Sequence, residues 1–228
     1  MEGTRAVTRA ILVALMLGVT ACAGTAASSS PSAVQPTVPP GRVTRDSGSS
    51  TLIPAGFGSL KQEEIAIVLQ PNGIRVTAIP LDESVIRVLA PDSYRTLRAT
   101  LEGKRQQIAQ RAAVHGVREP RVWYVTFAGL TPDARFVPTD MTVTSGGRDY
   151  RPFDVIGLTS GFGEQRLQPR EIQRALLLFG EGLDVSQPVV VAMGSERNAE
   201  WSNDRSDSIL SKIEAERAQV RARAGGRP

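Results

Sequence analysis

The 228-residue chain is poor in the residues that most often build reactive sites, with one cysteine, one histidine and 5% aromatic residues. A lone cysteine, Cys22, excludes a disulfide within the chain, so the folded part must be held by its hydrophobic core. Zinc sites take three or four Cys, His or carboxylate ligands, so no zinc site is predicted. No other metal and no cofactor is predicted either. His115 has no nucleophile motif beside it and directly precedes Gly116. We therefore expect it to cap a helix C-terminus rather than to act as a general base.

Lysine is also scarce, because only three of the 27 basic residues are lysines and the rest are arginines. The chain has 23 acidic residues and a formal net charge of +4. Basic and acidic residues alternate along the sequence without forming a basic stripe. The charge pattern therefore predicts a soluble surface and no nucleic-acid partner.

The first 22 residues have the order of a secretory signal. Arg5 and Arg9 provide positive charge, residues 10–19 are mostly apolar, and residues 19–22 read Val-Thr-Ala-Cys. The apolar stretch is too short for a comfortable membrane span, so it indicates a signal peptide. The small residues directly before a cysteine resemble the lipobox of bacterial lipoproteins.

That resemblance implies a lipid on Cys22, which becomes the mature N-terminus after cleavage. It also implies the membrane as a partner and a lipid-anchored place in the cell envelope. Stable anchoring takes more than one acyl chain. Ala23 follows the cysteine, which favours the outer membrane if the source is Gram-negative.

Composition divides the chain into four parts. Residues 1–21 are the predicted signal peptide, and residues 22–50 combine the lipidated cysteine with an Ala/Ser/Pro-rich tether that buries too little apolar surface to order itself. Residues 51–203 are expected to form a β-sandwich with a helical insert at 81–115. Residues 204–228 are expected to form a C-terminal helix with a frayed tail.

An opening β-hairpin is the clearest local feature. Apolar residues alternate in Glu64–Gln70 and again in Ile74–Ile79. Between these stretches stands Asn72-Gly73, the pair best suited to the positive backbone angles of a tight turn.

The next stretch predicts helices. Asp82 can cap a short helix, and Pro91 suits the start of a long helix running to about Val114. Its apolar residues follow a 3.6-residue period, with Gly103 inside it and Gly116 as its stop signal.

From residue 121 onward, short alternating segments with Gly and Pro turns favour a sandwich or barrel. The segments 172–179 and 189–193 are apolar enough to be central strands. A strand over 149–156 contains Pro152, which cannot donate to a ladder, so it should be an edge strand or carry a bulge. The last helix is predicted over 204–223, capped near Asp204 or Ser206.

Residues 121–201 also resemble immunoglobulin-like domains of bacterial envelope lipoproteins. The resemblance rests on Trp123–Phe127, Phe136–Asp140 and Leu167–Arg170. It implies an immunoglobulin-like β-sandwich that works as an interaction module. The fold class expected for the whole chain is thus mainly β, with an opening hairpin, a helical insert and a C-terminal helix.

Two loop aromatics, Phe136 and Phe162, are candidate interface residues, because aromatic side chains dominate interface energetics. The alternative is that each ring tucks under its own sheet. The only carboxylate pairs for acid–base chemistry are Glu63 with Glu64 and Asp149 with Asp154. Oxygen ligands for calcium could come from four loop aspartates, whose default role is as solvated turn residues: Asp133, Asp140, Asp149 and Asp154.

No catalytic residue set is predicted. The leading hypothesis is a membrane-anchored, non-enzymatic module that binds another envelope protein or supports an envelope assembly. A second hypothesis is a small-ligand-binding lipoprotein whose helices cover one end of the sandwich and leave a pocket. A cell-wall or lipid hydrolase working from carboxylates alone is the remote third.

Overall fold

The structure is a computed structural model that describes residues 53–54 and 56–225. The predicted signal at 1–21, the lipidation site Cys22 and the tether at 22–50 lie outside the described residues.

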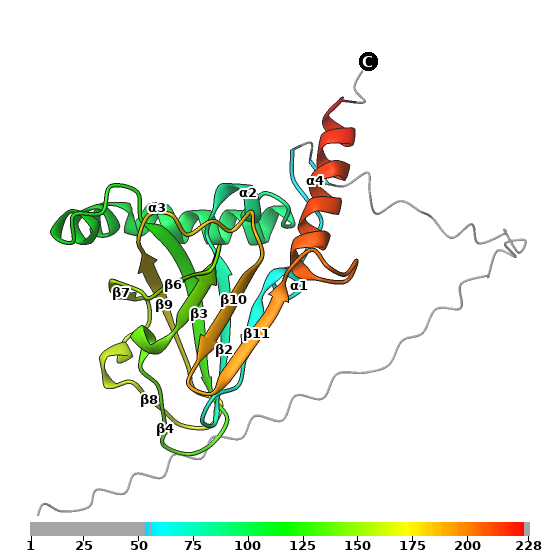
Figure 1. The fold of residues 1–228 in the computed structure, drawn as a ribbon. Helices are drawn as coiled ribbons and strands as arrows, with labels where there is room; N and C mark the ends of the chain where they lie inside the picture. The colour runs from blue at the N-terminus through cyan, green and yellow to red at the C-terminus, as the bar shows by residue number, and fades with distance from the viewer. Residues whose placement is uncertain (1–52, 55, 226–228) are drawn as a thin grey trace, which may run out of the picture. The chain divides into compact units, whose positions relative to one another are not determined.

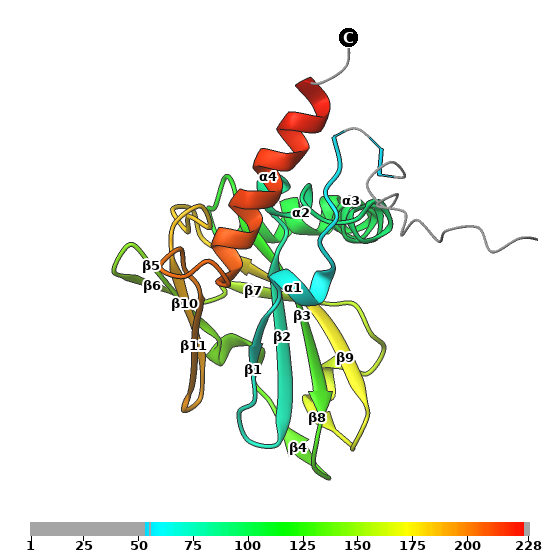
Figure 2. The ribbon, with the colours of Figure 1, turned by 90° about the vertical axis from the view of Figure 1, so that its right-hand side faces the viewer.

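Five strands form the larger sheet, in the order β1-β2-β3-β9-β7, and all neighbouring pairs are antiparallel (Figures 1 and 2). Its strands are β1 (Ile67–Leu69), β2 (Ile74–Pro80), β3 (Arg121–Gly129), β7 (Asp154–Gly157) and β9 (Ile172–Phe179).

A second antiparallel sheet has the order β11-β10-β5-β6. Its strands are β5 (Thr142–Ser145), β6 (Arg148–Tyr150), β10 (Val189–Met193) and β11 (Glu196–Trp201). The side-chain amide of Asn198 on β11 donates to the Val68 carbonyl on β1 at 3.0 Å, which ties the two sheets together along one side. A separate ribbon pairs β4 (Ala134–Arg135) with β8 (Arg166–Leu167).

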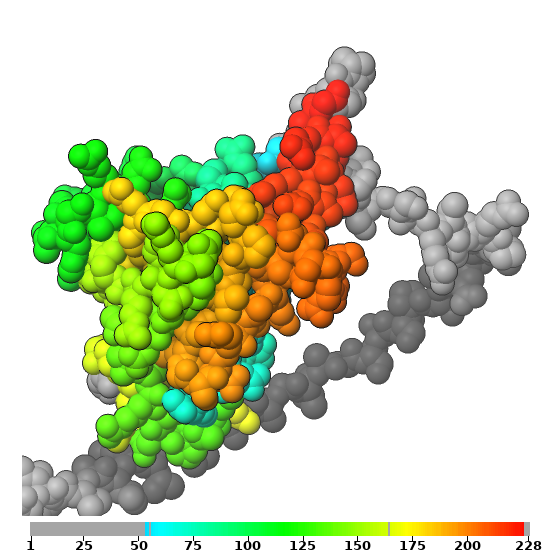
Figure 3. Space-filling view, in the orientation of Figure 1, coloured from blue at the N-terminus to red at the C-terminus, as the bar shows by residue number. Residues whose placement is uncertain are grey.

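The helices gather at one end of the sheets, where α3 lies across the strand ends and α4 rises beside α2 (Figures 1 and 2). They are α1 (Gln62–Ile65), α2 (Glu83–Ile86), α3 (Pro91–Val114) and α4 (Ile209–Gly225), with short 3-10 turns η2 (Pro138–Asp140) and η3 (Phe162–Glu164). In the space-filling view the outer half of α4 stands clear of the sheets (Figure 3).

The core lies between the sheets, where alternate side chains of β3 point inward. Trp123, Val125 and Phe127 are all fully buried. They pack with apolar residues of the second sheet such as Val143 and Val191. The predicted mainly β, sandwich-like class with a helical insert and a C-terminal helix is confirmed.

The hairpin turn is confirmed in its details, because Asn72 and Gly73 have φ values of 48° and 74° and β1 pairs antiparallel with β2. The predicted first strand is wrong over its first residues, which belong to helix α1. The backbone N–H of Lys61 donates to the Glu64 carboxylate at 2.7 Å, and this bond favours a helical turn over an extended strand.

The predicted strand over 149–156 is two strands. Pro152 separates β6 from β7, and the chain passes there from the smaller sheet to the larger one. Each of the two strands lies at the edge of its sheet, as the proline predicts. The central positions of β9 and β10 are also confirmed.

The helical insert follows its sequence signals. The Asp82 carboxylate accepts the backbone N–H of Ser84 at 2.9 Å and caps α2, Pro91 opens α3, and Gly116 beyond its end has a φ of 68°. The start predicted for the last helix is wrong, because α4 begins at Ile209. Asp204 instead accepts a bond from the Ser202 hydroxyl, which keeps this segment as a turn.

Candidate binding groove under helix α3

A groove of about 330 Å³ lies between α3 and the nearby ends of β2 and β3. Its walls come from residues 80–83 after β2, from one face of α3 between Arg98 and Ile108, and from residues 120–123 at the start of β3. Val185, in the loop between β9 and β10, lies at the remaining side.

Strand register and helix periodicity together place these walls. Pro80 lies opposite Trp123 in the β2–β3 pairing, and the Leu81 N–H extends this ladder to the Val122 carbonyl at 2.8 Å. On α3, Leu97 and Ile108 are buried, so the face between them points toward the sheet. Leu101 lies on that face and is only partly buried, because it borders the groove.

Six charged residues line the groove, three of each sign. The shortest pair joins Arg98 to Glu83 at 2.7 Å. The remaining pairs are Arg98–Glu102 at 3.0 Å, Arg121–Asp82 at 3.4 Å and Arg105–Glu102 at 3.5 Å. The groove is therefore electrically balanced, with its charges tied to one another at the rim.

Glu83 is the centre of this network. Its carboxylate accepts bonds from Arg87 at 2.7 Å, from the Tyr94 hydroxyl at 2.9 Å and from Arg98 at 2.7 Å. Burial alone raises the pKa of Glu83, but the bonds from Arg87 and Tyr94 and the charge of Arg98 outweigh burial and lower it. Burial and the bond to Glu83 in turn raise the pKa of Tyr94. The carboxylate thus stays ionised and holds α2 to α3.

The floor of the groove includes Trp123, whose side chain is fully buried. Its indole N–H has no hydrogen-bond partner among the residues that the structure describes. The other tryptophan differs, because the Trp201 indole N–H donates to the Val185 carbonyl at 3.0 Å. Buried N–H donors are nearly always satisfied, so the Trp123 donor requires an explanation.

The loop that carries Val185 is held firmly at the groove's edge. Tyr150 donates to the Gly182 carbonyl and Ser145 to the Asp184 carbonyl, each at 3.0 Å. Glu181 accepts the backbone N–H groups of Arg118 at 2.6 Å and Glu119 at 3.1 Å, and these bonds lower the pKa of Glu181. Side-chain hydrogen bonds therefore hold the loop that contributes Val185 to the groove.

The two predicted interface aromatics lie in an aromatic cluster at the other end of the sheets. Phe136 is only 3% exposed and stacks on Phe127, with ring centroids 4.4 Å apart. Phe162 is partly buried and meets Phe136 edge-on at 5.8 Å. The exposure that an interface role needs is thus missing at Phe136, because its ring completes the core beneath the β4–β8 ribbon.

His115 is the C-cap residue of α3, as its position before Gly116 predicts. Its backbone N–H bonds to the carbonyl of Ala112 at 3.1 Å. Its ring lies 5.0 Å from that of Phe153, and its Nε2 lies 3.7 Å from Asp154 Oδ2.

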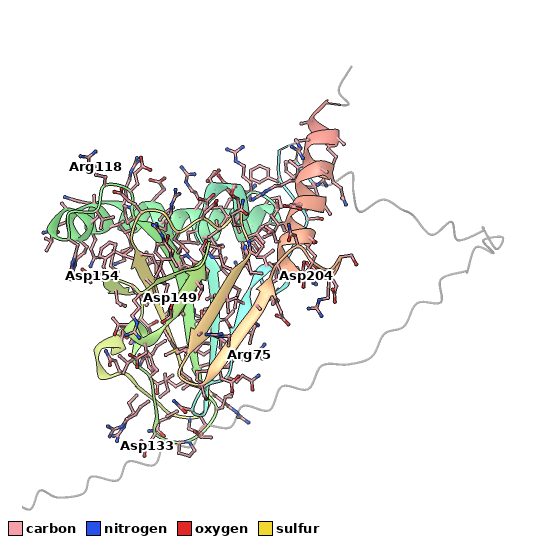
Figure 4. The ribbon with its side chains drawn as sticks, in the orientation of Figure 1. Arg75, Arg118, Asp133, Asp149, Asp154 and Asp204 are labelled. Carbon is pink, nitrogen blue, oxygen red and sulfur yellow. The ribbon has the colours of Figure 1, made fainter. Side chains whose placement is uncertain are left out.

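The carboxylates considered for chemistry do not converge. Asp154 pairs with Arg111 at 3.3 Å, whereas Asp149 accepts a bond from the Thr144 hydroxyl at 2.6 Å. Asp133 lies at the far end of the domain from Asp154 (Figure 4). No three His, Cys, Asp or Glu side chains of residues 53–54 and 56–225 are grouped so that they could hold a metal ion. Glu64 is engaged by the Lys61 N–H, and Glu63 is its neighbour in α1.

No helix within the described ranges is both long and apolar enough to cross a membrane. No protein-family model, curated protein or solved structure matches this chain.

Sequence reasoning offered a pocket where the helices cover one end of the sandwich as its second hypothesis, but it did not identify the residues that line this groove. Opposite charges one helical turn apart, such as Arg98 and Glu102 on α3, are typical of any solvent-exposed helix face. Only the tertiary structure brings that face against Trp123 and Val185, which lie far along the chain.

Proposed function

We propose that this protein is a lipid-anchored, non-enzymatic binding module of the cell envelope that takes a small ligand in the groove under α3. The observation that carries the proposal is that Trp123, whose buried indole N–H has no partner among the described residues, is one of the residues that line that groove. The groove's volume of about 330 Å³ lies at the small end of the range for ligand sites, which is about 300–1,000 Å³.

The lining selects the chemistry of the ligand. Leu81, Leu101 and Val185 offer apolar contacts. A hydrogen-bond acceptor on the ligand would satisfy the Trp123 N–H if binding displaces the side chains that bury this donor. Because three acidic and three basic residues balance at the rim, a neutral or zwitterionic molecule fits better than a strongly charged one.

A thermal-shift screen with a panel of neutral and zwitterionic metabolites tests this proposal. The full-length lipoprotein in detergent should gain stability with one chemical class of metabolite, and Leu101→Trp, which fills the groove, should lose that gain. Ala109→Trp, an exposed α3 position outside the groove, is the matched control and should keep it. Equal shifts in both variants, or no shift across the panel, would contradict the proposal.

The anchor is tested separately by intact-mass measurement. The native chain should begin at Cys22 and carry the mass of acyl chains, and the Cys22→Ser chain should carry none. An unmodified Cys22 in the mature protein would overturn the lipoprotein proposal without affecting the groove.

A second candidate is the protein-interaction or envelope-structural module predicted from the sequence. Two exposed apolar side chains favour it, because Leu130 is 50% and Ile172 is 42% exposed near the same end of β3 and β9. In-cell crosslinking should then capture one stoichiometric envelope protein that is lost in Leu130→Asp and Ile172→Asp. It should be retained in Val114→Asp, an exposed apolar position on α3. Equal capture by all three variants would exclude this surface.

A further inference from the structure

Two arginines lie directly opposite each other on the β4–β8 ribbon. The ribbon has two residue pairs, of which Ala134 and Leu167 are buried and Arg135 and Arg166 are exposed. Directly opposed residues of an antiparallel pair have their Cβ atoms about 5 Å apart. The two arginine side chains therefore leave the ribbon on the same face.

Like charges in this arrangement repel, and local compensation is slight. Arg166 Nε lies 3.6 Å from Asp133 Oδ1, an oxygen that also accepts a bond from the Gln168 amide at 2.8 Å. Among the side chains that the structure describes, Arg135 makes no ion pair. Within the described part of the chain, the ribbon thus holds more positive charge than its neighbours neutralise.

The backbone holds this pair in place. The Phe136 N–H donates to the Gln165 carbonyl at 3.1 Å, directly beyond the arginine pair, and the Phe136 ring is fixed in the core. Each strand of the ribbon is entered through a non-glycine residue in the left-handed region, Asp133 with φ 54° and Gln165 with φ 52°. Such unfavourable backbone conformations persist where the surrounding structure enforces them, often at binding sites.

A hollow of about 520 Å³ lies over the pair, lined by Arg135, Phe136, Val137, Gln165 and Arg166. It is at the other end of the domain from the groove under α3 and shares no lining residue with it. Each guanidinium group presents paired N–H donors. An occupant that contacts both groups must therefore offer acceptor oxygens to two such pairs and enough negative charge to offset two cations.

We propose that Arg135 and Arg166 form a binding site for a phosphate group. Free phosphate and a phosphomonoester present three or more unesterified oxygens and nearly two negative charges, whereas a carboxylate presents two oxygens and one charge. The phosphate group can come from free phosphate, from a small phosphomonoester or from a phospholipid headgroup. The phospholipid headgroup is a phosphodiester with two unesterified oxygens and one negative charge, so we expect it to bind the two arginines more weakly than the other two.

The experiment titrates the full-length lipoprotein, in a non-ionic detergent, with three probes by calorimetry. These probes are inorganic phosphate, glycerol phosphate and monomeric dihexanoyl phosphatidylglycerol. Saturable binding of inorganic phosphate indicates free phosphate as the source, and saturable binding of glycerol phosphate indicates a small phosphomonoester. Saturable binding of dihexanoyl phosphatidylglycerol alone indicates a phospholipid headgroup. Losing the charge-assisted hydrogen bonds of one guanidinium group typically weakens binding by about tenfold or more. We therefore expect Arg135→Gln and Arg166→Gln each to weaken binding of the probe by that factor.

Arg148→Gln is the matched control, because it removes the same charge from an exposed strand position on β6 outside the hollow. It should bind the probe as the native chain does. The absence of saturable binding for all three probes, or equal weakening in Arg148→Gln, would overturn the proposal.

Thermal unfolding separates loss of the site from loss of the fold. Without phosphate, Arg135→Gln should unfold at the same or a higher temperature than the native chain, since repulsion is relieved. Phosphate also stabilises proteins non-specifically, but that contribution is shared with Arg148→Gln.

Arg135→Lys keeps the positive charge and loses the paired N–H donors of the guanidinium group, so it should fold and still bind the probe weakly. Native affinity in Arg135→Lys would contradict a forked contact.

Discussion

Ser59 and Glu216 lie 157 residues apart in the sequence, and the Ser59 backbone N–H donates to the Glu216 carboxylate at 2.9 Å. The same carboxylate oxygen accepts a bond from Arg223 at 2.6 Å, and Glu216 is buried on α4. Next to it, Arg217 donates two bonds to the Ser84 carbonyl in α2. The start of the folded domain is therefore held between α2 and the C-terminal helix.

This contact predicts a graded effect of substitution at Glu216. Glu216→Ala leaves the Ser59 N–H and the Arg223 guanidinium without their acceptor, so we expect a loss of about 1–3 kcal/mol in unfolding free energy. Glu216→Gln keeps an acceptor oxygen and should lose less. Urea denaturation measures both values. Equal losses in the two variants would show that side-chain packing rather than the hydrogen bond matters.

Two glycines with opposite surroundings give a matched test of packing. A Cβ on Gly58 would lie 1.8 Å from the Val88 carbonyl oxygen, because Gly58 also bonds to the Arg87 carbonyl at 3.0 Å. Gly103 lies inside α3 with nothing within 4 Å of its Cβ position. Gly58→Ala should lower the melting temperature, whereas Gly103→Ala should add about 0.5–1 kcal/mol of stability. A stabilised Gly58→Ala would contradict this account of the domain's start.

The two buried tryptophans predict different costs for the same substitution. Trp201→Phe removes a hydrogen bond and leaves the buried Val185 carbonyl unpaired, whereas Trp123→Phe removes a donor that has no partner among the described residues. Both lose similar volume, so we expect Trp201→Phe to cost about 1–3 kcal/mol more. Chemical denaturation of the two variants checks the difference. An equal or larger loss for Trp123→Phe would show that its N–H is satisfied in solution.

Glu181 predicts a pH dependence of stability. Backbone bonds from Arg118 and Glu119 lower its pKa in the folded state, so its stabilising contribution is fully present above the ordinary pKa of about 4.3. That contribution is lost as the pH falls from this value through the lowered folded-state pKa. Glu181→Gln should therefore make the melting temperature less sensitive to pH below about 4.3 than in the native chain. Parallel curves for the two proteins in this range would contradict the assignment.

Local sequence signals predicted local structure well here. Asn72-Gly73 forms the predicted hairpin turn, and Asp82 and Pro91 lie at the starts of α2 and α3. The strands on either side of Pro152 are edge strands, as the proline predicts. These features depend on interactions within a few residues. The sequence therefore carries them directly.

The features that the sequence did not predict depend on contacts between residues that lie far apart in the chain. Pro152 was read as a feature within one strand, but the residues after it pair with β9 in the other sheet. For Phe136 the sequence left an interface role and burial under its own sheet both open, and the structure buries the ring against Phe127 and Phe162. The residues that line the groove and the pairing of the two arginines could not be foreseen, because each needs a strand register or a packing angle that no local pattern specifies.

Native mass spectrometry of the protein, purified from its own cells in mild detergent, tests the central claim of a ligand groove most directly. The native chain should carry a small molecule in addition to the acyl chains that we propose on Cys22. Ala109→Trp should carry the same molecule, and Leu101→Trp, which fills the groove, should lack it. If Leu101→Trp retains the molecule, or if the native chain carries none, the groove under α3 is not the binding site.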